Sequence, residues 1–212
     1  TIRFKPFLAF RNIHALCKAN YDVDTSYEPI SNGIKLRMYR GYSYLHLQFS
    51  KEPDYVHVPD WYYNIEYIRE KARGYDYLED LFVPGYFEMS IAKGESIYFS
   101  AGIEPVSPAT LKKLFTTEIE RRVPRDSFEN CLINAAQQFI VKRNKKVEVI
   151  AGYPWFGVWG RDTFIALPGL ALVVGEFKVA KSAIDTILQE MRGPLFPNMG
   201  IGEHALYNSA DA

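Results

Sequence analysis

The sequence has no excess of charge of either sign. Its 25 Lys and Arg residues are balanced by 25 Asp and Glu residues, so the formal net charge is zero. Proteins that bind DNA or RNA neutralise phosphates with a surplus of Lys and Arg, which this chain lacks. It also lacks a basic amphipathic face of the kind that lies on a membrane. These absences argue against nucleic acid and against a membrane as partners.

Cysteine is scarce, and long apolar runs are missing. Cys17 and Cys131 lie far apart, each in an apolar helical pattern, which predicts two buried thiols in a reducing compartment. No Cys/His spacing resembles a zinc site, and we predict neither a metal nor a cofactor. The longest apolar stretch, residues 164–175, is shorter than the ~20 residues that cross a bilayer, and the first ten residues lack a signal peptide's apolar core. We therefore expect a cytoplasmic location.

The chain also has no initiator Met, and it stops within a polar stretch, YNSADA. From these two features we predict that the 212 residues are a piece of a longer protein. The 212 residues are nevertheless enough for a sizeable core, in one large domain or two small ones.

The first half of the sequence predicts β-structure. Apolar residues alternate with polar or aromatic ones, as in a half-buried strand, and Asn32-Gly33 and Gly94 are turn signals. The predicted strands cover residues 33–39, 42–49, 61–68, 86–91 and 96–101. Short alternating strands with turn signals are typical of an antiparallel sandwich. A helical pattern over residues 10–20 precedes them.

The second half predicts helices. One follows Ser107 as N-cap and Pro108 at the first helical position. The next covers residues 126–143 and is capped by Asp126 or Ser127. Its apolar residues fall at helical spacing, namely Phe128, Leu132, Ala135, Ala136 and Phe139. Beyond residue 150 we predict one helix from Asp162 or Thr163 to about Val174 and another over 176–192, joined by long loops.

The loop over residues 151–163 places an adjacent cation and anion, Arg161-Asp162, behind a cluster of aromatic residues and glycines. Arg is a fixed donor and Asp an acceptor, so together they suit neighbouring sugar hydroxyls. The flat faces of Trp155 and Trp159 suit the apolar face of a pyranose. The alternative is a charged pair that caps the start of the helix. The flanking aromatic residues and the preceding glycine favour a binding loop.

A second polar loop, NMGIGEHALYNSADA, carries several groups capable of acid–base chemistry or hydrogen bonding. These are Glu203, His204, Tyr207, Asn208 and Asp211. Glycoside hydrolysis requires a carboxylic acid that protonates the leaving oxygen and a second carboxylate on the opposite side. Asp211 is a candidate acid if aromatic neighbours raise its pKa. The alternative for Asp211 is the N-cap of a following helix.

The stretches GYPWFGVWGRDTFIALPGL and GIGEHALYNSADA together resemble the amylo-α-1,6-glucosidase domain of glycogen debranching enzymes. The first is also similar to the W-x-R-D loop of the wider glucoamylase-like group. Upstream, LAFRNIHALCKAN and RGYDYLEDLFVPGYFEMSIAKGE resemble the β-rich domain that precedes the catalytic domain in bacterial and archaeal members. The resemblance covers nearly the whole chain.

The resemblance implies an α+β chain with three parts. Residues 1–105 are a β-sandwich, incomplete at its N-terminus. Residues 106–149 are linker helices, and residues 150–212 begin a truncated (α/α)6 barrel. The implied reaction is inverting hydrolysis of an α-1,6-linked glucosyl stub on glycogen or a branched dextrin.

The resemblance also assigns roles to individual residues. Asp211 matches the position of the family's proposed general acid, and Arg161 and Asp162 hold glucose hydroxyls. Trp159 and Trp155 wall the subsite. Three further residues line the same pocket, namely Tyr207, Asn208 and Glu203.

The family's general base lies downstream, and nothing in this chain matches it. An inverting enzyme needs two carboxylates about 6.5–9.5 Å apart. Glu203 is no substitute, because the family pattern gives it no such role. We therefore expect no hydrolase activity from these 212 residues alone.

Two other functions fit parts of the sequence. One is a non-catalytic α-glucan-binding or scaffolding module, in which exposed tyrosines of the β-rich half stack on glucan chains, although alternating aromatics also fit a half-buried sheet. The tyrosines in question are Tyr42, Tyr44, Tyr62, Tyr63 and Tyr67. The other is a glucoamylase or trehalase-like hydrolase, which the Arg-Asp loop serves equally well.

A truncated barrel has a physical consequence. The inner faces of its two helices lack partners, and exposed apolar surface of that size tends to find another surface. The residues concerned are Phe164, Leu167, Leu170, Ile184 and Leu188. We therefore expect self-association, or disorder from about residue 150 onward.

Overall fold

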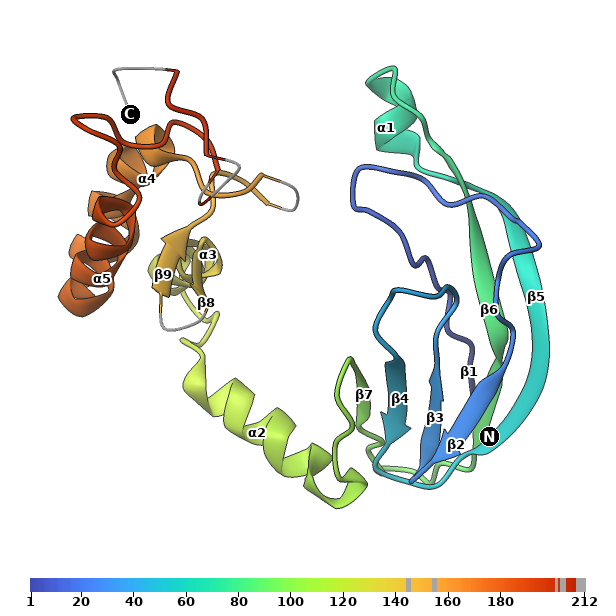
Figure 1. The fold of residues 1–212 in the computed structure, drawn as a ribbon. Coiled ribbons are helices and arrows are strands. Elements are labelled where there is room, and N and C mark those ends of the chain that lie inside the picture. Colours follow the sequence, from blue (N-terminus) through green and yellow to red (C-terminus); the bar gives the residue numbers. More distant parts are fainter. Residues whose placement is uncertain (144–145, 154–155, 201, 203–204, 209–212) are drawn as a thin grey trace. The chain divides into compact units, whose positions relative to one another are not determined.

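The computed structural model describes residues 1–143, 146–153, 156–200, 202 and 205–208 (Figure 1). The chain packs as two compact units, Thr1–Glu120 and Arg121–Ala212. The first unit is built from antiparallel sheets and the second mainly from helices, so the fold is a mixture of α and β. No helix in the described part of the chain is long and apolar enough to cross a membrane.

Two antiparallel sheets form the N-terminal unit. The first has the order β1-β6-β5, with β1 at Ile2–Phe4, β6 at Leu78–Met89 and β5 at Asp54–Glu66. The second has the order β2-β3-β4-β7, and its strands are Tyr27–Ile30, Gly33–Leu36, Leu45–Phe49 and Phe99–Gly102. A short helix, α1 at Ile68–Ala72, lies between β5 and β6.

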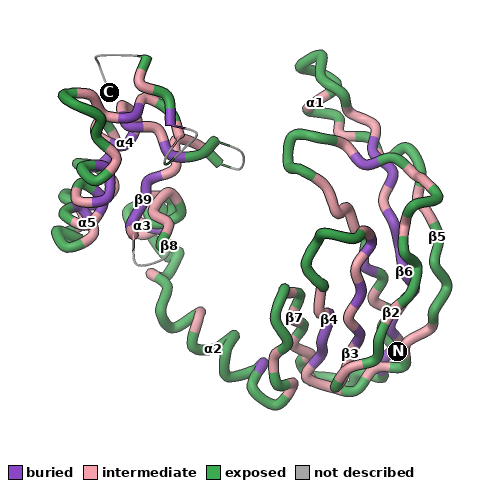
Figure 2. Tube along the Cα trace, in the orientation of Figure 1, coloured by how far each residue is buried: buried purple, intermediate pink, exposed green. Residues whose placement is uncertain are grey.

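The core of this unit is shared by the two sheets, as expected for a sandwich. Buried residues run along β3, β4 and β6 (Figure 2). The predicted inward residues Ile34, Leu36 and Met38 are buried, as are Leu47 and Phe49, so this alternation is confirmed. They pack against Phe82, Phe87 and Met89 of the other sheet.

Two expectations for this unit are wrong. The segment 10–20 is not helical, because the amides of Cys17 and Ala19 bind Glu79 and Asp80 of β6 instead of a helical turn. The alternation over 61–68 is interrupted by a register shift between Tyr62 and Ile65, where Asn64 has φ of 56°. The Gly94 turn connects β6 and β7, which lie in different sheets and do not pair with each other.

Two helical segments follow the sheets. A 3-10 turn, η1 at Pro108–Thr110, has Ser107 at its N-cap and leads into α2 at Leu111–Arg121. The next helix, α3 at Phe128–Gln138, is capped by Ser127, whose Oγ accepts a hydrogen bond from the Asn130 amide at 3.1 Å. Of the two residues proposed for that cap, Ser127 is the one observed.

The apolar residues of α3 do not form a buried face. Phe128 is 80% exposed and Leu132 is 55% exposed, whereas Asn134 is buried and its amide donates to the carbonyls of Val123 and Asn130. Cys131 is also exposed, so only Cys17 is the buried thiol that the sequence predicts.

The C-terminal unit contains a hairpin that the sequence analysis missed. The predicted helix over 126–143 ends at Gln138, and strands β8 at Ile140–Arg143 and β9 at Lys146–Val149 follow. Val147 and Val149 of β9 pack against helices α4 at Gly160–Leu167, η2 at Pro168–Leu172 and α5 at Phe177–Leu188. Helix α4 begins at Gly160, two or three residues earlier than predicted, and α5 ends at Leu188, before the predicted end at residue 192.

The hairpin also covers part of the face that was expected to lack partners. Leu167 is 4% exposed, because it lies in the core with Val149 and Ala183, and Phe164 stacks edge-on against Phe196 at 4.9 Å. Ile184 and Leu188 stay exposed at 38% and 47%. The expectation of an unpartnered face is therefore wrong for Leu167 and Phe164, and also for Leu170, which packs against the same core. Self-association remains a prediction.

Candidate functional site

The two loops singled out in the sequence are paired with each other. Trp159 forms an antiparallel bridge with Met199, which in turn bridges to Leu206. The Gly200 amide donates to the Val158 carbonyl at 2.9 Å, and the amides of Asn198 and Leu206 bind the carbonyls of Leu206 and Met199 at 2.8 Å. Backbone hydrogen bonds thus bring the Arg-Asp loop and the second polar loop together.

The pairing fixes the N-terminal end of α4. The amide of Gly160, the first residue of the helix, donates to the carbonyls of Pro197 and Asn198 at 3.1 Å each. Thr163, one turn later, is 1% exposed, and its Oγ1 donates to the Val149 carbonyl at 3.4 Å. The two residues between them, Arg161 and Asp162, are therefore held on a backbone that is anchored on both sides.

Arg161 and Asp162 lie partly exposed at this helix end. Their side chains are 41% and 38% exposed, and Arg161 Nε lies 4.0 Å from Asp162 Oδ2, at the limit of an ion pair. The helix has no side-chain cap, so the simple capping interpretation does not describe Asp162. Its Oδ2 atom is buried and accepts no hydrogen bond within the described residues. A buried acceptor of this kind needs a donor, such as a sugar hydroxyl.

Asn198 belongs to the same site, although the sequence analysis did not find it. Its Nδ2 donates to Asn208 Oδ1 at 3.0 Å, while its own Oδ1 is buried and unpaired among the described residues. Its backbone carbonyl receives the Gly160 amide. No local motif marks this asparagine, because its importance comes from contacts with distant positions of the chain.

Tyr207 is held by a second group of residues that motif reasoning missed. Its hydroxyl donates to the Glu190 carbonyl, and the Arg192 guanidinium lies 4.7 Å from its ring centroid. The Glu190 carboxylate accepts hydrogen bonds from Lys146 Nζ and from the Gly202 amide, both at 3.0 Å. Lys146, followed by the Gly202 amide, lowers the pKa of Glu190. A charged residue thus ties the second loop to the β8–β9 hairpin.

Aromatic side chains flank the helix end. Trp159 is half-buried, and the ring of Phe156 meets it edge-on with centroids 6.1 Å apart. Tyr153 is 56% exposed and lies edge-on to Phe139. Exposed aromatic faces beside hydrogen-bonding groups fit a ligand with both apolar and hydroxyl-bearing faces.

Of the predicted site residues, five lie in the described part of the chain: Arg161, Asp162, Trp159, Tyr207 and Asn208. They belong to the two paired loops. Trp155, Glu203 and Asp211 lie outside the described residues, as does His204, and the roles suggested for them remain predictions. Among the described residues, no group of three or more His, Cys, Asp or Glu side chains is placed to hold a metal ion.

The tyrosines considered for glucan stacking do not form one row. Tyr44 immediately precedes β4, whereas Tyr62 and Tyr63 lie on β5 in the other sheet. The Tyr67 hydroxyl donates a hydrogen bond to the buried Glu79 carboxylate at 2.5 Å, so Tyr67 does not belong to an exposed row of tyrosines.

The described residues thus place hydrogen-bonding groups and aromatic side chains together at the N-terminal end of α4, an arrangement that suits a ligand with hydroxyl groups and an apolar face. Comparisons with known proteins show the family. The family model described as "Glycogen debranching enzyme N terminal" matches residues 1–98, and the model described as "Amylo-alpha-1,6-glucosidase" matches residues 134–212. The chain belongs to the glycogen debranching enzyme family, which confirms the resemblance.

A curated relative supports the same assignment. The glycogen debranching enzyme of Saccharomyces cerevisiae is 40% identical over 68 residues, which cover 29% of this chain and 4% of the yeast protein. The chain therefore spans a small part of that relative's length. No solved structure matches the chain.

Proposed function

We propose that this chain contributes the glucose-binding part of a site that hydrolyses α-1,6-glucosidic branch linkages in glycogen or a branched dextrin. One observation carries the proposal. The Arg-Asp loop and the second polar loop are hydrogen-bonded to each other at the start of α4. There, Asp162 Oδ2 and Asn198 Oδ1 are buried acceptors without a hydrogen-bond partner in the described residues. The family membership supports the choice of an α-glucan as substrate.

Each described residue has a role that follows from its chemistry. The Arg161 guanidinium donates to hydroxyl oxygens, and Asp162 Oδ2 and Asn198 Oδ1 accept from hydroxyl groups. Trp159 offers a flat face to the C–H groups of the ring. Tyr207 and Asn208 are positioned by Glu190 and Asn198 and border the same sugar.

The chemical step follows from the family resemblance. Asp211 protonates the leaving glycosidic oxygen, and a second carboxylate activates a water that attacks the anomeric carbon from the opposite face, which inverts its configuration. The catalytic unit is expected to be an (α/α)6 barrel, and the second carboxylate to lie downstream of residue 212. The 212 residues alone should therefore bind glucosides without hydrolysing them, and glucose release from a branched dextrin by the purified chain would contradict this.

Calorimetric titration of isomaltose, an α-1,6-linked disaccharide, tests the binding site. Charge-assisted hydrogen bonds contribute about 1.5–3 kcal/mol, so Arg161→Ala should weaken the affinity roughly 10- to 100-fold. Lys178→Ala, which changes an exposed cation on α5, is the matched control and should bind as the parent does. Equal affinities of the parent and Arg161→Ala would contradict the proposed role of the pair.

A further inference from the structure

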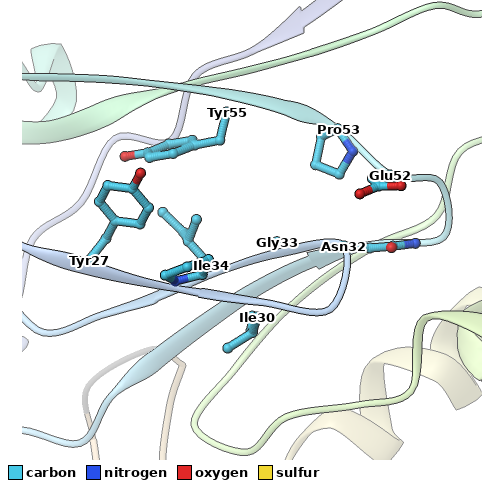
Figure 3. A pocket seen from close by; sticks show the side chains of 9 residues that line it. Tyr27, Ile30, Asn32, Gly33, Ile34, Glu52, Pro53 and Tyr55 are labelled. Carbon is cyan, nitrogen blue, oxygen red and sulfur yellow. The ribbon is translucent and has the colours of Figure 1, made fainter.

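A pocket of about 190 Å³ opens in the N-terminal unit, which does not contain the candidate site (Figure 3). It lies between the β2–β3 hairpin and the start of β5. Of these strands, β2 and β5 are edge strands, since β2 begins one sheet order and β5 ends the other. The pocket is thus a feature of the sandwich edge.

Two tyrosines form one end of the pocket, and both are held in place. Tyr55 donates its hydroxyl to the Pro84 carbonyl at 2.8 Å and packs 4.9 Å from the ring of the buried Phe87. The ring of Tyr27 meets Tyr55 edge-on at 4.7 Å (Figure 3). It also lies 4.8 Å from the ring of His57. A ligand would meet these aromatic surfaces without first ordering them, which reduces the entropy lost on binding.

The opposite end is polar. Asn32, at the hairpin turn with φ of 51°, and Glu52 line it (Figure 3). Within the described residues, neither side chain makes a hydrogen bond or an ion pair, so their donor and acceptor groups are open to a ligand. The backbone of the hairpin turn packs closely against β4, because a Cβ at Gly33 would lie 1.9 Å from the Leu47 carbonyl oxygen. The turn therefore holds Asn32 at a fixed place beside the pocket.

The lining selects among ligand classes. It includes no Lys or Arg, and Glu52 adds negative charge, so phosphates and other anions are disfavoured. Pro29 in the outer strand β2 lacks an amide donor, which disfavours a peptide that adds as a further strand. Aromatic faces at one end and amide and carboxylate groups at the other suit a neutral ring that carries hydroxyls.

We propose that this pocket is a second α-glucan-binding site, which holds one glucosyl unit between the Tyr27–Tyr55 end and the Asn32–Glu52 end. It would anchor a linear, α-1,4-linked part of the polymer. The identity of the sugar rests on the proposed function, whereas the existence of a neutral-ligand site rests on the pocket itself.

Calorimetric titration of maltotriose into the full chain tests the proposal, with three pocket variants. Tyr27→Ala removes an aromatic wall, and Glu52→Gln removes an exposed charge. Asn32→Gly removes the amide without strain, because glycine tolerates the positive φ. Each lost contact should weaken maltotriose binding about three- to tenfold. Tyr21→Ala, a fully exposed tyrosine of the same unit outside the pocket, should bind as the parent does, and circular dichroism verifies folding of every variant.

The outcomes separate this proposal from the proposed function. If the pocket variants lose maltotriose binding while isomaltose binding still depends on Arg161, both sites exist. If maltotriose binding is unchanged in Asn32→Gly and Glu52→Gln, the pocket proposal is wrong, whatever happens at Arg161. If the pocket variants lose binding and Arg161→Ala changes nothing, the proposed function fails alone. Binding of tetramethylammonium, and not of maltotriose, to the pocket would identify a cation site and overturn the glucan assignment.

Discussion

Each unit contains an Arg–carboxylate pair, and the two pairs differ in how completely their hydrogen bonds are satisfied. In the N-terminal unit, Glu79 has a side chain that is 1% exposed, and it accepts from Arg11 Nε at 2.5 Å and Nη2 at 3.1 Å. It also accepts from the Tyr67 hydroxyl at 2.5 Å and the Cys17 amide at 2.9 Å. In the C-terminal unit, Asp162 is 38% exposed, and its buried Oδ2 accepts no hydrogen bond within the described residues.

The difference separates a structural pair from a binding pair. Glu79 ties the irregular segment around Cys17 to strand β6, and it has no capacity left for a ligand. Asp162 and Asn198 hold acceptors on an anchored backbone and leave them unused. Fully satisfied buried networks fix a fold, whereas unpaired polar groups at a fixed helix end indicate a ligand.

Glu79→Ala should have the largest effect. It leaves the Arg11 guanidinium and the Cys17 amide without their shared acceptor, and breaking a buried pair from one side lowers the free energy of unfolding by about 3–5 kcal/mol. Urea denaturation measures this. The control is Glu66→Ala, which removes an exposed ion pair with Lys71 and should change the free energy of unfolding by less than about 1 kcal/mol. Similar losses for the two variants would remove the distinction between the pairs.

The second-largest effect should come from acid, which weakens the contribution of the Glu79–Arg11 pair to the free energy of unfolding. Burial alone raises the pKa of Glu79, but hydrogen bonds from Arg11, Tyr67 and the Cys17 amide outweigh it and hold the pKa below 4.5. Because the folded-state pKa is depressed, the stabilisation is present above about pH 4.5 and is lost as pH falls through the folded-state value. In urea titrations, the stability difference between the parent and Glu79→Gln should shrink on acidification. A constant difference would mean that Glu79 is not ionised in the folded state.

Glu190→Ala should have a smaller effect, confined to the C-terminal unit. It removes the acceptor of the Gly202 amide and the partner of Lys146, which loosens the second loop but leaves Arg161 and Asp162 in place. Isomaltose affinity should fall about three- to tenfold, and hydrogen exchange at Gly202 should accelerate. Glu176→Ala, at an exposed position before α5, is the control. Faster exchange with unchanged affinity would show that the second loop does not contribute to the sugar site.

The sequence predicted the elements whose pattern is local. Ile34, Leu36 and Met38 alternate with a period of two, and the structure buries all three. The segment 10–20 also has a helical pattern, but Glu79 and Asp80, far along the chain, bind its amides at Cys17 and Ala19. Residues 140–143 continue the apolar pattern of α3 and yet form a strand, because their partner, β9, follows immediately.

The residues of the candidate site also fall into two groups, those that a local sequence pattern predicts and those that only contacts between distant segments reveal. Arg161, Asp162, Tyr207 and Asn208 were found because they lie in two recognisable stretches. The residues that position them, Asn198, Glu190 and Lys146, act through contacts between distant segments. Because the sequence analysis assigned residues 140–149 to linker helices and not to a hairpin, nothing in it connects Lys146 with the loop that begins near Gly200.

The most direct test of the account is a titration of isomaltose followed by amide chemical shifts. If the paired loops form one sugar site, the amides of Gly160, Arg161 and Asp162 should shift together with those of Asn198, Tyr207 and Asn208, with a single affinity, while the amides around Glu79 stay unchanged. Shifts in one loop only, or none in either, would contradict the claim that the two loops bind one glucose.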